Sequence, residues 1–296
     1  GTVRLLDLMA GRSFSAPRDL VALGPTLFFS ATDEAGREPW RSDGTGVGTV
    51  RVVDLSPGPV GSEPSRPVVQ AGQLYFLAED AMSGRELWRS DGTAAGTVRL
   101  KQDLEPLTSL WRWSAVGPLL FFNHGRELWR SDGTVEGTLQ VRAASAYESP
   151  PYWLTAVGDT LFFAADDAQA GRELWASDGL PQGTRQVKDI LPGYGTSNLT
   201  QLRAVGNVLF LLAKEASNLP YQLWRSDGTA EGTQRLTQFP LGAGSDALLS
   251  AGGRVYVAER LAAGRARLWR AGASGAGRLA RSSRLARMSI FLTPDR

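Results

Sequence analysis

The chain repeats the stretch Glu86-Leu87-Trp88-Arg89-Ser90-Asp91-Gly92-Thr93, with Gly96-Thr97 after it, and this repeat decides the fold. The same eight residue types recur at 127–134, and looser copies surround four other tryptophans. Successive copies are 41 to 49 residues apart, which is the length of one four-stranded propeller blade. The six repeated tryptophans, each taken as the centre of one blade, are Trp40, Trp88, Trp129, Trp175, Trp224 and Trp269.

Each repeat unit carries the signals of four short strands. In the fourth unit, an apolar segment at 154–157 ends at a tight Gly-Asp turn, and a strand rich in β-forming residues follows at 160–165. Strands at 173–176 and 184–190 flank a Ser-Asp-Gly turn, and helix signals are nearly absent. The sequence therefore predicts an all-β, six-bladed β-propeller with four antiparallel strands per blade. We expect residues 1–296 to form this propeller as a single domain.

The first residues predict how the ring closes. Gly1–Leu8 repeats the fourth-strand phrase of Gly48–Leu55 and precedes the first complete unit. We expect this strand to pair with the last blade at Leu268–Arg270 and so to remove a sheet edge. Residues 277–285 are the rival fourth strand of that blade, and the sequence leaves the choice between the two open.

Composition argues against several classes of function. The 296 residues carry 32 Lys and Arg against 30 Asp and Glu, and a formal charge of +2 does not suit a nucleic-acid binder that relies on bulk charge. No run of 18 apolar residues is present, so no membrane span is predicted. Because the chain has no cysteine and one histidine, thiolate sites, multi-histidine metal sites and a Ser-His-Asp triad are not expected.

The repeated phrase resembles that of the bacterial ELWxxDGT repeat family, and the match extends from Gly1 to about Arg270. The resemblance implies a β-propeller that is secreted or held at the cell surface, with no established catalysis. The sequence departs from the family phrase at Pro39, at Leu180-Pro181, and in the last copy, which lacks the Glu and the Asp-Gly turn. Terminal units of repeat arrays are often atypical, so the fold prediction is unchanged.

The Ser-Asp-Gly-Thr turn also looks like the Asp-box of sialidases, and we interpret it as a folding element. Asp91 is placed to accept hydrogen bonds from turn amides while Gly92 adopts a positive φ. The rival interpretation is calcium binding, for which one aspartate per turn supplies too few oxygens. The same structural role is expected of Asp43, Asp132, Asp178 and Asp227.

Binding residues are expected on the face that collects the connectors after the second strands and between the blades, because these loops vary most. Aromatic residues without a place in the repeat suit stacking on sugars or contact with protein partners. A shortened connector in blade three predicts a notch that holds the single histidine. The alternative for all of them is ordinary loop packing. The candidate ligand-binding residues are Trp111, Tyr147, Tyr152, Trp153, Tyr194 and His124.

Four acids at matching positions after the second strands form a candidate metal site, since converging carboxylates suit calcium. The alternative is that they are solvated loop ends, or ion-pair partners of Arg37, Arg85 and Arg172 three to five residues on. No other cofactor is expected. The four acids are Asp33, Asp80, Asp167 and Glu215.

The segment 278–296 breaks the repeat as an irregular basic segment. Its arginines recur every three residues, which suits contact with an anionic surface or an acidic partner. The alternative is a solvated edge strand or a short basic helix. The arginines are Arg278, Arg281, Arg284 and Arg287.

Together these observations favour a non-catalytic, exported propeller that binds a glycan or a protein through its variable loop face, in the manner of a lectin. A structural scaffold subunit without a small ligand is the alternative, and a sialidase-like glycoside hydrolase is the second alternative. The hydrolase would need a Tyr-Glu nucleophile pair, for which Tyr147 and Glu148 are weak candidates because neighbouring strand residues point oppositely. The sequence leaves open whether the chain is an enzyme.

Overall fold

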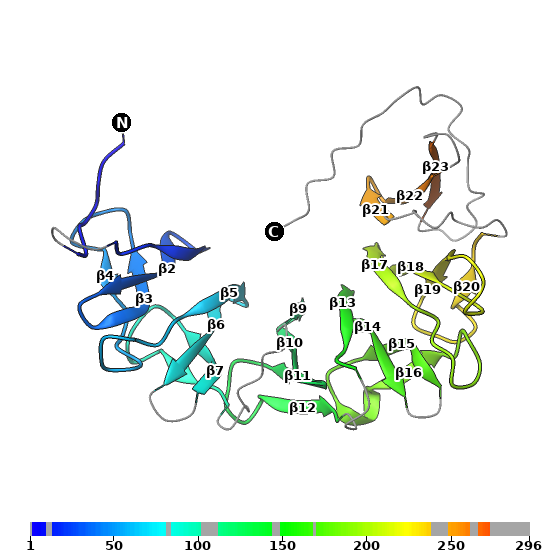
Figure 1. Cartoon of the computed structure of the whole chain (residues 1–296), viewed down its shortest axis with the longest axis horizontal. Helices are drawn as coiled ribbons and strands as arrows, with labels where there is room; N and C mark the ends of the chain where they lie inside the picture. Colours follow the sequence, from blue (N-terminus) through cyan, green and yellow to red (C-terminus); the bar gives the residue numbers. More distant parts are fainter. Residues whose placement is uncertain are drawn as a thin grey trace. The chain divides into compact units, whose positions relative to one another are not determined.

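The computed structural model describes residues 2–9, 14–80, 84–101, 112–143, 149–167, 170–237, 248–260 and 266–272. These residues form six antiparallel sheets (Figure 1), and the one helical element among them is a 3₁₀ turn, η1 (Pro181–Gly183). No helix in this part of the chain is long and apolar enough to cross a membrane. The prediction of an all-β chain built from four-stranded antiparallel sheets is confirmed for five of the six sheets.

Each sheet is a meander of consecutive strands. The first contains β1 (Arg18–Leu23), β2 (Thr26–Asp33), β3 (Gly36–Ser42) and β4 (Val50–Arg51). The second contains β5 (Ser65–Gln70), β6 (Gln73–Asp80), β7 (Gly84–Ser90) and β8 (Val98–Arg99). The third contains β9 (Trp113–Val116), β10 (Leu119–His124), β11 (Glu127–Ser131) and β12 (Leu139–Arg142).

The fourth sheet contains β13 (Tyr152–Val157), β14 (Thr160–Asp167), β15 (Gly171–Ser177) and β16 (Arg185–Lys188). The fifth contains β17 (Thr200–Val205), β18 (Val208–Ala213), β19 (Gln222–Ser226) and β20 (Gln234–Arg235). The sixth contains β21 (Leu248–Ala251), β22 (Arg254–Arg260) and β23 (Ala266–Gly272). The rival fourth strand at 277–285 and the basic segment 278–296 lie outside the described residues.

The chain divides into two compact units. The first and second sheets lie in one unit, the fourth, fifth and sixth lie in the other, and the third sheet is divided between them. Residues 2–9 form no strand, so the expected pairing of this segment with the last sheet is absent from the described residues. Instead, this segment lies against the turn of the first sheet that contains Gly46. A Cβ atom added to Gly46 would be 2.7 Å from the backbone carbonyl oxygen of Leu5.

The second strand of a sheet carries a continuous apolar run. In β6 all residues from Leu74 to Ala78 are buried, and β14 repeats this from Leu161 to Ala165. Side chains on both faces of a strand are buried only when other elements cover both faces of its sheet. One core cluster joins the first and second sheets and contains Phe28, Val52, Leu74, Phe76, Ala78 and Trp88.

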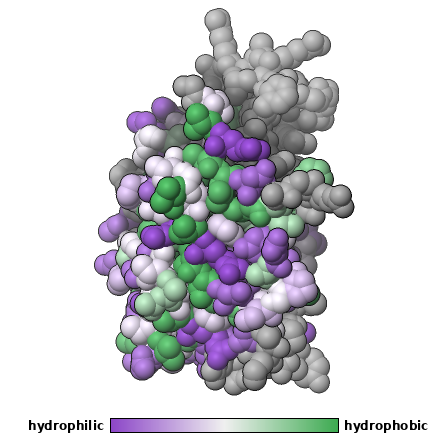
Figure 2. Space-filling view, turned by 90° about the vertical axis from the view of Figure 1, so that its left-hand side faces the viewer, coloured by the Kyte–Doolittle hydropathy of each residue, from purple (hydrophilic) through white to green (hydrophobic). Residues whose placement is uncertain are grey.

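Exposed apolar side chains are scattered over the surface. On the face drawn in Figure 2 they are interspersed with polar residues. Val3, Phe14 and Val47 are among the most exposed of them. Isolated apolar residues are a normal feature of protein surfaces and do not by themselves indicate a partner.

The repeated Ser-Asp-Gly-Thr turn has the structural role that the sequence predicts. Asp91 Oδ1 accepts hydrogen bonds from the backbone N–H and the hydroxyl of Thr93, both at 2.8 Å, and these bonds lower the pKa of Asp91. Gly92 has φ +93°, and a Cβ on it would lie 2.6 Å from Cζ of Phe28, so the turn also packs against the preceding sheet. The equivalent backbone hydrogen bond is accepted by Asp43, Asp132, Asp178 and Asp227.

The first strand of four sheets contains a bulge that no sequence signal announces. At its second residue the backbone φ lies between +54° and +58° and the strand register shifts, although none of these residues is glycine. Such a conformation costs an L-residue on the order of 1 kcal/mol. A bulge re-aims the side chain that it carries. The four residues are Asp19, Arg66, Trp153 and Gln201.

Candidate functional site

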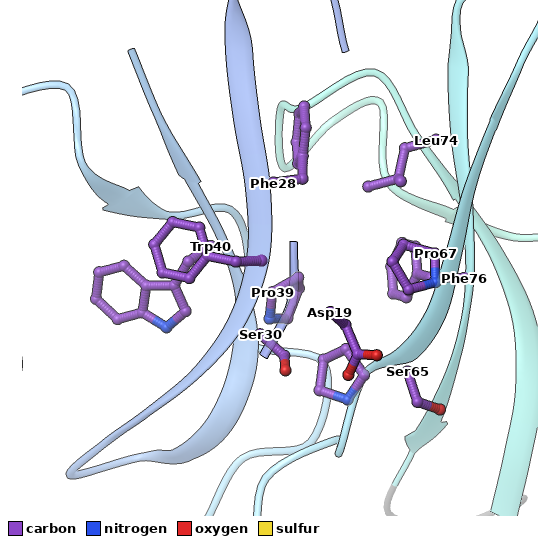
Figure 3. Close-up of a pocket in the computed structure, with 11 residues that line it drawn as sticks. Asp19, Phe28, Ser30, Pro39, Trp40, Ser65, Pro67, Leu74 and Phe76 are labelled. Atoms are coloured by element: carbon purple, nitrogen blue, oxygen red, sulfur yellow. The ribbon is translucent and has the colours of Figure 1, made fainter. Parts of the chain in front are cut away.

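A small pocket lies between the first and second sheets, within one compact unit (Figure 3). Its empty space is about 280 Å³ when the open solvent at its mouth is counted, so the enclosed part is much smaller and admits one small group rather than a large ligand. Figure 3 shows rings from both sheets on opposite sides of the gap. Its apolar lining consists of Phe28, Phe29, Pro39, Trp40, Pro64, Pro67, Leu74 and Phe76, and its polar lining of Asp19, Ser30 and Ser65.

Pro39 connects this pocket to the departure noted in the repeat. In four other sheets the residue before the repeated tryptophan is a fully buried leucine. A proline ring is smaller than a leucine side chain and has no flexible arm to extend into the neighbouring sheet. The substitution therefore leaves room where the repeat ordinarily fills it. The four leucines are Leu87, Leu128, Leu174 and Leu223.

The polar groups gather at one end of the pocket (Figure 3). Asp19 lies at the bulge of β1, is exposed, and makes no hydrogen bond or ion pair among the described residues. Ser65 begins β5, and its hydroxyl is buried without a hydrogen-bond partner in the described part of the chain. A buried hydroxyl without a partner costs about 1–3 kcal/mol. Trp40 Nε1 is likewise buried without a partner in this part of the chain, so the lining holds one acceptor and two donors with open bonding capacity beside apolar walls.

A buried glutamate of the repeated phrase fixes the connector that carries Ser65. Glu38 accepts hydrogen bonds from the backbone N–H groups of Leu55 and Ser62, at 3.0 and 2.9 Å, and from the Ser62 hydroxyl at 2.6 Å. Burial raises the pKa of Glu38, while these hydrogen bonds act in the opposite direction. Bonds between β3 and a connector some twenty residues away therefore position one side of the pocket.

Glu173 makes the same clamp in the fourth sheet. It accepts hydrogen bonds from the backbone N–H groups of Ile190 and Ser197, at 2.9 and 3.2 Å. Its side chain is completely buried, and this burial raises its pKa to about 7. Glu173 is thus a folding residue, and its charge state depends on pH near neutrality.

The raised pKa of Glu173 predicts a pH dependence of stability. The folded chain binds this proton more tightly than the unfolded chain between the ordinary value of 4.5 and about 7, so the free energy of unfolding falls as pH rises across this window. The fall is on the order of 3 kcal/mol. Urea denaturation at about pH 5 and about pH 7.5 measures it. In Glu173→Gln, which cannot ionise, we expect a clearly smaller fall, and an equal fall would contradict the assignment.

The structure places the predicted ligand-binding residues in different environments. His124 ends β10 and is buried, with 8% of its surface exposed, so it does not stand in an open notch. Trp153 packs against the core cluster of the fourth and fifth sheets, and Tyr152 is half-buried. Tyr194 is 87% exposed. Trp111 and Tyr147 lie outside the described residues.

Three of the four predicted metal ligands pair with arginines inside their own sheets. In each pair an acid at the end of the second strand, or just after it, contacts an arginine of the fourth strand, across the third strand. Asp167 ends β14. No group of three or more acids, histidines or cysteines that could hold a metal ion occurs among the described residues. The pairs are Asp33 with Arg51, Asp80 with Arg99, and Glu215 with Arg235.

No family model and no curated protein matches the chain. Among solved structures, oligopeptidase B from Leishmania major matches with a TM-score of 0.51 at 14% identity, over 87% of this chain and 38% of that one. A puromycin hydrolase mutant in complex with PGG matches with a TM-score of 0.49 at 16% identity, over 88% and 43%. The β-propeller domain of the Trilobed protease from Pyrococcus furiosus matches with a TM-score of 0.47 at 11% identity, over 91% and 85%.

These matches concern the fold, and the chain spans about two fifths of the length of the first two structures. They correct the expectation of a glycan-binding, lectin-like module, because the match with a TM-score above 0.5 is to an oligopeptidase. Of the predicted aromatic candidates, Tyr152 and Trp153 are half-buried and packed against other residues, and Tyr194 is exposed.

Proposed function

We propose that the chain is the propeller module of a peptidase system and holds a polypeptide segment while catalytic groups on another domain or subunit cleave it. The pocket between the first and second sheets is the observation that carries this proposal. The fold likeness to oligopeptidase B supports it, since the matched part is 38% of that protein. A ring of six blades and export from the cell, the latter implied by the repeat family, remain predictions.

The pocket has the chemistry that a polypeptide needs. One apolar side chain of the peptide fills the space left beside Pro39 and removes apolar surface from water. The Ser65 hydroxyl donates to a peptide carbonyl, and the Asp19 carboxylate accepts from a peptide N–H. Both groups then gain partners that the described residues do not give them. A bulged edge strand beside the pocket suits an extended chain.

Isothermal titration with amidated, acetylated octapeptides that differ at one central residue tests this function. Peptides with Leu, Val or Pro at that position should bind more tightly than the Gly peptide, by roughly 3- to 10-fold for the buried apolar groups. Ser65→Ala should weaken binding several-fold without lowering the melting temperature, because it removes a hydroxyl that lacks a partner in the free protein.

Asp19→Asn removes the charge but keeps a residue that tolerates positive φ, and it should also weaken peptide binding. Glu34→Gln is the matched control, since Glu34 is an exposed acid on the hairpin of the same sheet and does not line the pocket. Absence of binding by all the peptides, or equal affinity of wild type, Ser65→Ala and Asp19→Asn, would refute the proposed function.

A further inference from the structure

Arg112 is an exposed arginine whose backbone is held firmly. Its N–H donates to Oδ1 of Asn123 at 2.6 Å, and its carbonyl accepts from the N–H of Asn123 at 3.2 Å. Asn123 is itself buried in β10. This reciprocal pair fixes the start of β9, so the side chain of Arg112 begins from a defined point.

The guanidinium group of Arg112 lies over an aromatic ring that has a second cation beside it. Its Cζ is 5.7 Å from the ring centroid of Tyr152, and Cζ of Arg172 is 5.0 Å from the same centroid. Such contacts restrict a guanidinium and remove part of its water while its N–H groups stay available. All three residues belong to the same compact unit.

The two arginines differ in how their charges are balanced. Arg172 makes a bidentate pair with Asp166, at 2.8 and 3.2 Å, and its charge is neutralised there. Asp166 also accepts from the backbone N–H of Ser149 at 2.6 Å, so this carboxylate is fully engaged. Arg112 is exposed, and its guanidinium has no acidic partner and no hydrogen bond among the described residues. Among the described residues, the cluster therefore has one positive charge without an acidic partner.

We propose that Arg112, stacked on Tyr152, binds the carboxylate of a peptide. A guanidinium fork matches a carboxylate with two parallel N–H···O hydrogen bonds, and its stacking on the ring limits the freedom lost on binding. The nearby Arg172 is paired with Asp166, so it does not compete for the same carboxylate. This inference rests on the proposed function for its peptide source. The carboxylate chemistry itself follows from the cluster alone.

Titration with four probes tests the site and distinguishes the sources of the carboxylate. They are an acetylated tripeptide with a free C-terminal carboxylate, the same tripeptide amidated, an amidated tripeptide with a glutamate side chain, and sodium acetate. The free-acid tripeptide should bind at least about tenfold more tightly than its amide, as expected for a charge-assisted bidentate contact. Tighter binding of the glutamate probe would assign the site to an acidic side chain instead.

Variants identify the responsible residue. Arg112→Gln should abolish the preference for the acid over the amide, and Arg112→Lys should restore it only in part, because lysine keeps the charge and lacks the planar fork. Arg126→Gln is the matched control: Arg126 is an exposed arginine in the turn after β10 and makes no contact with Tyr152. All three variants should unfold at the wild-type temperature, because none removes a buried group.

The outcomes separate this inference from the proposed function. Octapeptide binding, together with tripeptide binding that shows no preference for the free acid or a preference that Arg112→Gln leaves unchanged, would overturn the carboxylate site and leave the function standing. Acid-selective binding of the tripeptide or acetate that depends on Arg112, without octapeptide binding, would uphold the site and overturn the function. Equal effects of Arg126→Gln and Arg112→Gln would show only general charge attraction and would overturn the site.

Discussion

Replacement of Glu173 by alanine is expected to lower the free energy of unfolding by on the order of 3–5 kcal/mol at neutral pH, a large part of the stability of an ordinary domain. The backbone N–H groups of Ile190 and Leu191 would lose their acceptor, and that of Ser197 would keep only its hydrogen bond to the Arg172 carbonyl. Ile190 and Ser197 are buried, so water cannot replace the carboxylate without entering the fold. The truncation also leaves a cavity.

Urea denaturation followed by tryptophan fluorescence measures this loss. Glu231→Ala is the control, because Glu231 is exposed in the turn of the next sheet. That change should alter the free energy of unfolding by less than about 0.5 kcal/mol. A loss below about 1 kcal/mol in Glu173→Ala would show that the connector does not depend on this acceptor.

Gly36→Ala is expected to be the most damaging change in the first sheet. Gly36 has φ +98°, and a Cβ on it would lie 2.4 Å from the backbone nitrogen of Gly61 and 2.8 Å from the carbonyl oxygen of Gly58. These are backbone atoms of the connector that leads to Ser65, and they cannot turn away as a side chain can. We expect a loss on the order of 3 kcal/mol and weaker peptide binding.

Gly44→Ala separates the two causes of this loss, the positive φ and the clash with the connector. Gly44 has φ +90°, nearly the same backbone conformation, but a Cβ there would meet no atom within 4 Å. It should show only the conformational cost, about 1–2 kcal/mol. Thermal unfolding of the two variants side by side gives the difference. Equal losses would mean that the close approach of Gly36 to the connector does not matter.

The local parts of this fold were predictable from the sequence. The periodic phrase located the strands of the fourth sheet to within a few residues, because turn glycines and β-forming residues act over short distances. The Asp-Gly turn was likewise predictable, since Asp91 bonds to residues two positions on. The position of the first residues was not predictable, because strand pairing with a distant sheet has no local signal.

Most of the candidate site could not be predicted from the sequence. The departure at Pro39 was visible in the repeat, yet its consequence depends on the packing of two sheets. The bulge at Asp19 has no local sequence signal. The positions of Asp33, Asp80 and Glu215 predict metal ligands, but in the structure their partners are arginines 18 to 20 residues further on. Comparison of the Gly-Thr-x-Arg phrase in three units would have found those partners.

Hydrogen exchange with and without a bound peptide tests the central claim most directly. The probe is the acetylated, amidated octapeptide with a central leucine, at a concentration well above its dissociation constant. We expect slower exchange in β1 and β5, the strands that carry Asp19 and Ser65, with no change in the fifth sheet. Unchanged exchange in both strands under saturating peptide would contradict the claim that this pocket holds a polypeptide.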